Sequence, residues 1–554
     1  MHMHKALLFL LAVGQGGQGS VGQGGQGGAL ANSPSCDTLR VSASPVFRTS
    51  PAFASWNVDS SRQRSFFDIN LADHRITSLA SQIGGHRLRF GGTGNDFLFY
   101  SIADGMPPCP PTVPYVNECF NASLWRGLTT LAASSRSELI FGISMLPFNS
   151  TWHPSPYPEP DQNWQWNSTN AAALLRAAKA AGIPIWGLEL GNEVDNEPPH
   201  GKGWSAQQQS SAAFKLHALL DEIYGTGPGR PVIVGPDAHG FHVPVPDPHS
   251  TAMISYITDY VNRTQQILTA VTHHEYIEIN ETNVLDPAFL DNTKGIARNV
   301  MAAVRAINSS LEVWAGEIGP HNGGNFGPQG QSPNCEGNRV CGRFGSALWY
   351  ADAMAAKARE GYSAFFRQSS IPPLLFRFAS LLCTSYLWRL WIARSSFEQD
   401  ILGADYALLN TTSLRPSPDW WLLVLWQRLV GTAVLDAALP PSAPLAIRTY
   451  AFCASVGGRA ALVLVNLQRS ASCVSLPADA VRGANFSQWS LTGGGGGPGS
   501  VVSAETLLNG QLLELDATGK APPLGGQSFA GLSVRMPPVS VNLVLYATSI
   551  VACA

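Results

Sequence analysis

The stretch IWGLELGNEVDN at residues 185–196 predicts the fold of the chain around it. Apolar, β-forming residues continue up to Leu190, and the pattern then changes abruptly to Gly191-Asn192-Glu193. Such a change indicates a buried parallel strand that ends at a polar surface. In open sheets and barrels, catalytic groups lie at the carboxyl ends of these strands. Lone strand-end glutamates also serve as loop or capping residues, so a catalytic role for Glu193 requires a second carboxylate in the same setting.

Strand and helix patterns alternate on both sides of this stretch. Residues 83–96 predict a strand with Leu88 and Phe90 facing inward, and Asn170 is a plausible cap for an Ala-rich helix at 170–181. Further strands are predicted at 139–143, 232–237, 267–276, 311–317 and 362–368, and further helices at 210–224, 294–308 and 346–359. A polar cluster follows almost every strand. The pattern therefore predicts an α/β fold, a (β/α)8 TIM barrel at residues 61–434 with its site on one face.

The last part of the chain has a different pattern. From residue 435 to residue 554, short strands are separated by Gly-rich turns such as 493–497, and no helix pattern occurs. This pattern predicts an accessory C-terminal β-sandwich domain.

Composition excludes several classes of protein. Only 13% of the 554 residues are charged and 45% are hydrophobic, so the chain can bury a large core. The net charge is -3 and no basic stripe occurs, which argues against nucleic acid as a partner. Gly91-Gly92 lies in neither a GxxxxGK[ST] nor a GxGxxG pattern, so we expect no nucleotide site and no cofactor.

The N-terminus predicts a secreted, extracellular protein. Lys5 precedes the short apolar run at 6–13, which is typical of a signal peptide, and a Gly/Gln low-complexity tract continues to residue 31. Cleavage after Gly14 and cleavage at the 29–31 triplet both fit. Eight Asn-x-Ser/Thr sequons support secretion, with a lysosome- or vacuole-like compartment or the cell surface as alternative locations. They begin at Asn121, Asn149, Asn167, Asn262, Asn280, Asn308, Asn410 and Asn485.

The nine cysteines favour disulfides over metal binding. They include the short-spaced pairs Cys109/Cys119 and Cys335/Cys341, whereas no CxxC occurs and no histidines lie near these cysteines.

The second carboxylate is Glu317, at the end of the predicted strand VWAGE. Two carboxylates at the ends of separate barrel strands suit glycoside hydrolysis, in which one is a protonated acid and the other a charged nucleophile or base. Asn192 can bind a sugar 2-hydroxyl, and the His273-His274/Tyr276 cluster ends an intervening strand. No third ligand is spaced to complete a zinc site, so we expect no metal and assign His274 and Tyr276 to orientation and substrate contacts.

The ordered motifs resemble the heparanase family, glycoside hydrolase family 79. They include LRFGGTGNDFL, ELGNE, VGPD, VTHHEY, VWAGE, FFRQ, ADYALLN and SPDWWLLVLWQRLVGTAVL, and together they extend from about Arg87 to Cys553. The resemblance implies that Glu193 is the acid/base and Glu317 the nucleophile of a retaining mechanism, with carboxyl groups about 5–5.5 Å apart. A dry or anionic setting should then favour the acidic form of Glu193.

The resemblance also implies a glucuronic-acid-containing glycan as substrate. Gly323, Gly324 and Tyr406 correspond by position to residues that bind the uronate carboxylate, and Asp96, Thr93 and Asn192 match other sugar contacts. The family architecture further implies that segment 32–60 joins the β-sandwich. It also implies a Cys453–Cys553 bridge and leaves Cys36 with Cys473.

The chain departs from the family in two places. Residues 103–119 and 237–250 carry no Lys or Arg, which favours a less charged glycan, such as a proteoglycan side chain, over sulfated chains. Near residues 371–396, roughly 26–30 residues have no counterpart in relatives.

Three interpretations of this anomalous insert compete: a membrane span, a functional insertion, and a retained intron or gene-model error. Pro372-Pro373, Arg377 and Arg389 argue against a stable span, and an exposed apolar loop argues against a functional insertion. We favour the third interpretation, which also explains the odd cysteine, Cys383. If the insert is translated, the alternative function is a catalytically inactive carbohydrate-binding relative. The sequence makes no prediction about oligomeric state.

Overall fold

The computed structural model describes most of the chain from residue 36 onward. The described residues are 36–60, 70–109, 118–145, 165–195, 203–321, 340–368, 407–410, 413–476, 485–549 and 551–553. The insert at 371–396 and the N-terminal residues 1–31 lie outside them.

Eight parallel strands close into a barrel in the order in which they occur along the chain, and the last pairs with the first. They are β3 (Ala54–Asp59), β4 (Arg87–Gly91), β7 (Glu138–Ile143), β8 (Gly187–Leu190), β9 (Val232–Phe241), β10 (Leu268–Tyr276), β11 (Glu312–Gly319) and β12 (Ala364–Arg367). All four residues of β8 are buried, as expected for a parallel strand that is covered on both faces.

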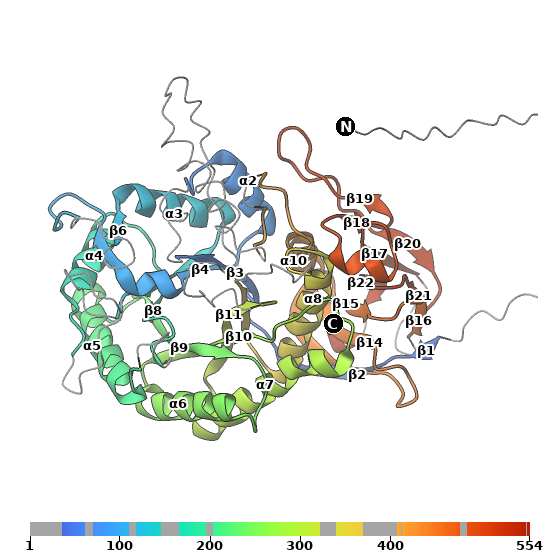
Figure 1. Ribbon diagram of the computed structural model, residues 1–554, viewed down its shortest axis with the longest axis horizontal. Helices are drawn as coiled ribbons and strands as arrows, with labels where there is room; N and C mark the ends of the chain where they lie inside the picture. The colour runs from blue at the N-terminus through green and yellow to red at the C-terminus, as the bar shows by residue number, and fades with distance from the viewer. Residues whose placement is uncertain are drawn as a thin grey trace, which may run out of the picture. The chain divides into compact units, whose positions relative to one another are not determined.

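Within the described ranges, one helix follows each barrel strand, and together they form the outer layer in Figure 1. They are α2 (His74–Ile83), α3 (Ala122–Ser135), α4 (Thr169–Ala180), α5 (Ala206–Tyr224), α6 (Pro248–Thr264), α7 (Pro287–Ile307), α8 (Phe344–Glu360) and α10 (Pro418–Leu429). The sequence therefore predicts the α/β barrel correctly. A short 3-10 helix, η1 (Thr93–Phe97), and the paired strands β5 (Leu98–Ser101) and β6 (Glu118–Asn121) follow β4.

The predicted cap of α4 is wrong by two residues. The N-cap is Ser168, and Asn170 lies inside the helix. The Asn170 side chain instead accepts a hydrogen bond from the backbone N–H of Tyr100 and donates one to its carbonyl, at 2.8 and 2.9 Å. Asn170 thus ties α4 to β5, a long-range partner that a local capping pattern does not reveal.

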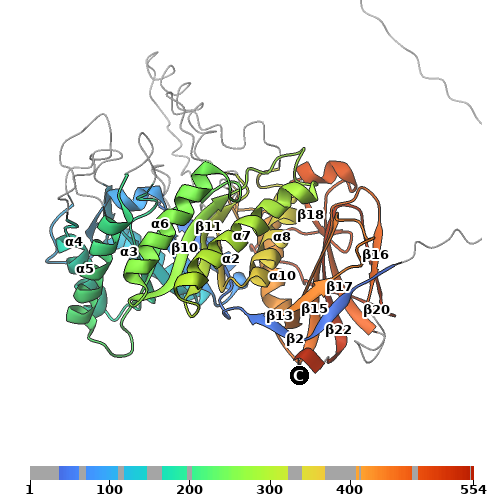
Figure 2. The same ribbon diagram turned by 90° about the horizontal axis from the view of Figure 1, so that it is seen from below.

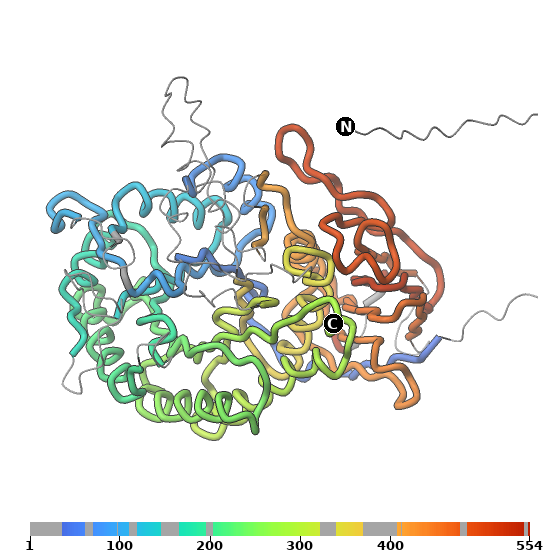
Figure 3. The backbone as a smooth tube through the Cα atoms, viewed as in Figure 1, coloured from blue at the N-terminus to red at the C-terminus, as the bar shows by residue number. Residues whose placement is uncertain are grey.

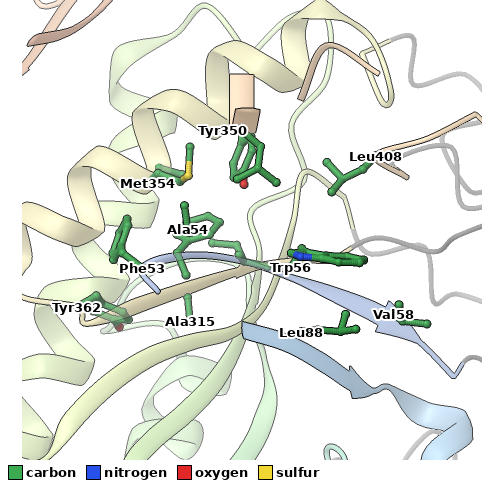
Figure 4. Close-up of a cluster of buried hydrophobic side chains, with 14 of the residues drawn as sticks. Phe53, Ala54, Trp56, Val58, Leu88, Ala315, Tyr350, Met354, Tyr362 and Leu408 are labelled. Atoms are coloured by element: carbon green, nitrogen blue, oxygen red, sulfur yellow. The ribbon is translucent and has the colours of Figure 1, made fainter. Parts of the chain in front are cut away.

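The barrel strands face two different cores. Phe90 stacks on Phe141 of β7, which packs edge-on against Trp125 of α3, so these alternate positions face the helices. The prediction that Leu88 and Phe90 point inward holds for burial, but both belong to the cluster between strands and helices and not to the lumen. Figure 4 shows part of this layer, where Phe53 and Ala54 lie beside Tyr350 and Met354 of α8. A separate apolar cluster of inward-facing residues fills the barrel, formed by Ile140, Val234, Ala270, Trp314, Ala364 and Phe366.

The C-terminal region forms two sheets. One has the strand order β19-β18-β17-β22-β15-β14-β13-β2 with β20 beside β17, and the other has the order β1-β16-β21. The strands are β1 (Asp37–Thr38), β2 (Arg40–Arg48), β13 (Val430–Ala438), β14 (Ile447–Ala454), β15 (Arg459–Asn466), β16 (Ser472–Ser475), β17 (Asn485–Gly493), β18 (Thr506–Leu508), β19 (Gln511–Leu512), β20 (Gln527–Ala530), β21 (Ser533–Met536) and β22 (Ser540–Ser549). Leu462 and Val544 of the larger sheet share a core with Val474 and Val534 of the smaller one. The assignment of this region to the β-sandwich class stays a prediction.

The N-terminal segment 32–60 is divided between the two regions, contrary to the prediction. β2 pairs with β13, and Figure 3 shows this blue segment beside the C-terminal part of the chain. β3, in contrast, is a barrel strand between β12 and β4. The reason is burial: five of the six β3 residues are buried, whereas β2 alternates between exposed and partly exposed residues. The other predicted domain boundaries are not tested and stay predictions.

Helix α8 lies between the barrel and the C-terminal sheets, as Figure 2 shows. Fifteen of its residues in succession, 344–358, are buried, which is the pattern of a helix covered on all sides. Arg448 and Tyr450 of β14 both bind Asp352 of α8, at 2.9 and 2.6 Å. Arg448 also binds Asp291 of α7 at 2.6 Å, so a buried ion pair with Asp352 and a partly exposed one with Asp291 join the two regions.

Three disulfides are present among the described residues, and all three were predicted: Cys109–Cys119, Cys36–Cys473 and Cys453–Cys553. Cys341 is also disulfide-bonded, whereas Cys335, its predicted partner, lies outside the described residues. Among the helices that the structure describes, none combines the length and the apolar character that a membrane span requires.

Candidate active site

Arg89 of β4 lies at the centre of the barrel and joins three other strands, β8, β9 and β11. Its guanidinium binds Glu189 of β8 at 2.5 Å and Asp237 of β9 at 2.6 Å. It also binds Glu317 of β11 and Asn192, just after β8, both at 3.1 Å. Gly91 provides the space for this side chain, because a Cβ there would lie 2.6 Å from the Arg89 Cζ. These residues meet although up to 228 positions separate them in the chain.

Glu193 takes its place through an uncommon backbone conformation. Gly191 and Glu193 both have positive φ, of 76° and 48°, in the left-handed region that non-glycine residues seldom adopt. The backbone N–H of Glu193 donates to the carbonyl of Asp237 at 3.0 Å, which fixes the turn against β9. Such strain is concentrated at functional sites, and here it brings the Glu193 side chain to the carboxyl end of the barrel.

His274 of β10 binds carboxylates through both ring nitrogens. Nδ1 lies 2.7 Å from Glu193 Oε1, and Nε2 lies 2.6 Å from Asp237 Oδ1. Burial alone would lower the pKa of His274, but Asp237 and Glu317 raise it well above its usual value. His274 is therefore a fully buried imidazolium between acidic groups.

Glu317 lies near the same ring nitrogen of His274 as Glu193. Its Oε1 accepts a hydrogen bond from the Tyr276 hydroxyl and lies 3.7 Å from His274 Nδ1. The other oxygen binds Arg89. An oxygen of Glu317, an oxygen of Glu193 and a nitrogen of His274 all lie within 4.8 Å of one another. The structure thus brings together four residues that the sequence predicts: Glu193, His274, Tyr276 and Glu317.

This triplet of donors is compact enough for a metal ion, but its hydrogen bonding does not suit one. A metal requires the lone pair of a neutral imidazole nitrogen. His274 faces a carboxylate from each nitrogen, so both nitrogens carry protons and offer no lone pair. The donor set therefore favours an ion-pair network.

The protonation of Glu193 differs from the expectation. Burial alone would raise the pKa of Glu193, but His239 and His274 hold it well below its ordinary value. The two imidazoles flank opposite oxygens of the carboxylate, at 3.3 Å for His239 and 2.7 Å for His274. The expected dry or anionic setting is thus outweighed by two imidazoles, which favour the ionised form of Glu193.

Two other buried carboxyls behave in the opposite way. Burial raises the pKa of Glu189 to about 7, although Arg89 opposes the shift. Burial also raises the pKa of Asp195 to about 6, and here His239 opposes it. The site therefore holds titratable groups besides the two expected glutamates.

The predicted sugar contacts occupy varied positions. Asp96 is buried and accepts hydrogen bonds from the backbone N–H groups of Met145 and Asn192, at 3.1 and 3.0 Å. Asn192 accepts from Arg89 and from the Gly92 N–H, so its Oδ1 braces the end of β8. Thr93 is partly exposed at the start of η1. Gly323, Gly324 and Tyr406, the predicted uronate-binding residues, lie outside the described residues.

Sequence reasoning missed Arg89, Glu189, Asp237 and His239. A signal was available for the first two, since each is a charged residue between apolar neighbours on a buried strand: Leu88-Arg89-Phe90 and Leu188-Glu189-Leu190. In a barrel the apolar neighbours face the helices, so the charged residue must face the lumen. Asp237 and His239 follow the apolar part of β9, as expected of site residues.

Comparison with known proteins shows the family of the chain. Residues 53–355, more than half of the chain, match the family model described as glycosyl hydrolase family 79, N-terminal domain. The chain belongs to glycoside hydrolase family 79. This family 79 chain is thus a glycosidase, and the heparanase-like resemblance seen in its motifs is confirmed.

Relatives of this family 79 chain match it over most of their length. It is 23% identical to heparanase-like protein 3 of Arabidopsis thaliana, covering 79% of this chain and 77% of the relative. It is 25% identical to baicalin-beta-D-glucuronidase of Scutellaria baicalensis, covering 83% and 80%. The solved structure of a 4-O-alpha-L-rhamnosyl-beta-D-glucuronidase from Fusarium oxysporum shares the fold, with a TM-score of 0.60, 13% identity and coverage of 92% and 99%.

Proposed function

We propose that the protein is a secreted retaining β-glucuronidase that cleaves glucuronic acid residues from a glycan by double displacement. In this mechanism Glu317 attacks the anomeric carbon while Glu193 protonates the leaving oxygen. Glu193 then activates a water molecule that releases the sugar from Glu317.

The spacing of the two carboxylates carries the mechanistic part of the proposal. Retaining glycosidases hold their carboxyl groups about 5–5.5 Å apart, whereas inverting enzymes leave about 6.5–9.5 Å for a water molecule. Oxygens of Glu193 and Glu317 lie within 4.8 Å of each other, which supports retention.

The partners of each glutamate support their different roles. Glu317 is bound by Arg89, by Tyr276 and, at a longer distance, by His274, and these contacts orient its carboxylate for attack. Glu193 contacts imidazoles on both oxygens, so a proton can reach it or leave it. Asn192, braced by Arg89, would meet the sugar through its Nδ2.

Similarity to a relative named as a glucuronidase supports a glucuronide substrate. The loop at 237–250 contains no Lys or Arg, which favours a glycan with one carboxylate per recognised sugar over a densely sulfated chain. Gly323, Gly324 and Tyr406 are our candidates for binding that carboxylate. Secretion rests on the N-terminal apolar run and the sequons.

The direct test is release of glucuronic acid from an aryl β-glucuronide. We expect Glu193→Gln to lower kcat/KM by roughly 10²–10⁴-fold and Glu317→Gln to abolish turnover. Glu222→Gln is the matched control, because Glu222 lies on the outside of α5 in an exposed pair with Arg176. A folded wild-type protein that binds glucuronides without releasing them would contradict the proposal and indicate an inactive carbohydrate-binding relative.

A further inference from the structure

Glu193 contacts a second imidazole whose role the reaction scheme leaves unassigned. His239 Nδ1 lies 3.3 Å from Glu193 Oε2, the oxygen opposite the one that faces His274. His239 comes from the end of β9 and His274 from β10, so each oxygen has its own imidazole on its own strand.

The backbone holds His239 in this place. Its N–H donates to both carboxylate oxygens of Asp195, at 3.1 and 3.3 Å. Asp195 is buried and lies two residues after Glu193, so the segment after β8 is clamped to the end of β9. The clamp involves only the backbone N–H of His239. A substitution of the His239 side chain should therefore leave the end of β9 in its place next to Glu193.

The two imidazoles differ in their access to water. The His274 side chain is completely buried, with carboxylates on both nitrogens, whereas the His239 side chain is 14% exposed. Of these two groups, His239 is therefore the one that can exchange a proton with solvent while it remains next to Glu193.

We propose that His239 is a positioning residue that stores the proton for Glu193 between turnovers, when its partial exposure lets that proton exchange with water. This proposal rests on the proposed glycosidase function. Before glycosyl transfer, the proton on His239 Nδ1 moves to Glu193 Oε2, which leaves a neutral imidazole and a carboxylic acid. Glu193 then gives that proton to the leaving oxygen, later removes a proton from the attacking water, and returns it to His239.

The surroundings of His239 suit a proton store. Besides Glu193 and Asp195 after β8, it faces His274 of β10 and the ring of His249 of α6, which lies edge-on at 5.4 Å between centroids. His242, on the same loop, stacks on His249 at 6.1 Å. Burial lowers the pKa of His239, but Glu193 and Asp195 outweigh burial and raise it above its usual value. This shift favours the protonated form of His239, as the role requires.

The kinetic test measures kcat/KM of wild type and His239→Gln on two substrates over a range of pH. An alkyl glucuronide needs a proton on its leaving oxygen, whereas glucuronyl fluoride does not. We expect the variant to lose at least about tenfold in kcat/KM on the alkyl glucuronide near pH 7, with the basic limb of its pH profile moved to lower pH. On glucuronyl fluoride, kcat/KM of the variant should be nearly that of wild type. An equal loss on both substrates at every pH would show a merely structural role and overturn the proposal.

A titration of the histidine rings tests the pairing without activity. In protein with ¹⁵N-labelled histidine, the signal that disappears in His239→Gln is followed through pH in wild type and in Glu193→Gln. We expect the pKa of His239 to fall by at least about one unit in Glu193→Gln, because its carboxylate partner is gone. An unchanged value would overturn the proposal, whether or not the wild type hydrolyses glucuronides. If the wild type releases no glucuronic acid although the titration shifts as expected, the proposed function fails while the pairing stands.

His217→Gln is the matched control for both measurements. His217 lies on α5 at 3.4 Å from Asp221 and is 34% exposed, so it is also a histidine beside a carboxylate, but on the outer layer of the barrel. It should leave both the pH profile and the His239 signal unchanged.

Discussion

At the scale of single residues, one arginine organises the site. Arg89 is 1% exposed and forms ion pairs with three acidic side chains from three different strands, namely Glu189, Asp237 and Glu317. Removing one member of a buried ion network leaves the others charged and uncompensated, which costs more than the network itself contributes. Arg89 thus affects both the fold of the barrel and the orientation of Glu317.

Arg89→Met should destabilise the protein by about 3–5 kcal/mol, because it leaves these carboxylates without their cation. Arg176→Met, which breaks the exposed pair with Glu222 on the helical layer, should cost no more than about 1 kcal/mol. Urea unfolding of both variants beside wild type measures the difference. Equal unfolding midpoints for the two variants would contradict the role assigned to Arg89.

The sequence predicts the site only in part, for a physical reason. Glu193, His274, Tyr276 and Glu317 end apolar strands, so a local pattern marks them. Arg89 and Glu189 lie within strands, where only a charged residue between apolar neighbours marks them and nothing local indicates their partners. The protonation of Glu193 depends on His239 and His274, which lie more than 40 residues further along the chain. A local sequence pattern covers far fewer residues than that separation, so it cannot predict these contacts.

At the scale of elements, alternation of strand and helix is the feature that the sequence predicts best. The predicted strand at 139–143 and the observed β7 differ by one residue, and the predicted strand at 267–276 matches β10 equally well. The starts of helices are predicted less well. For α7 the predicted start is Lys294, whereas the helix begins at Pro287 after its cap Asp286. Proline at the first helical position and an aspartate cap mark this start, and the apolar periodicity alone does not.

The disulfides should stabilise the protein more when they close a longer loop, with an effect that grows as the logarithm of loop length. The Cys453–Cys553 bridge spans 100 residues and ties the C-terminus to β14, whereas Cys109–Cys119 spans 10. We expect Cys453→Ala/Cys553→Ala to cost about 4.7 kcal/mol and Cys109→Ala/Cys119→Ala about 3 kcal/mol. Thermal unfolding of the two double variants measures the order. A larger loss for the short loop would contradict this account.

At the scale of the whole molecule, the barrel and the C-terminal sheets share α8 and a network of charges around Arg448. The sequence suggests two regions because the helix pattern stops near residue 435. It does not show that β2 and β3, only five residues apart, belong to different regions. Their partners, β13 and β12, are more than 300 residues away in the chain.

Acid stability of the whole molecule should depend on His86, just before β4. Burial lowers the pKa of His86 to about 4, although Gln427 of α10 opposes the shift. Between an unfolded pKa near 6.5 and this value, the unfolded chain binds a proton that the folded chain does not. Stability is therefore fully present above about pH 6.5 and falls as pH decreases toward 4, by about 3 kcal/mol from this group.

His86→Gln should remove that part of the pH dependence. Urea unfolding at pH 4.5 and pH 7 in wild type and variant measures the slope. The same decrease in both proteins would contradict the role of His86.

The proposed function requires Glu193 and Glu317 to form the carboxylate pair of a retaining β-glucuronidase. Proton NMR of the first turnovers on an aryl β-glucuronide tests it most directly, because the anomers of free glucuronic acid give separate signals before they interconvert. For a retaining mechanism we expect β-glucuronic acid to appear first. Initial release of the α-anomer would contradict it, since inversion requires a water molecule between carboxylates that lie too close together here.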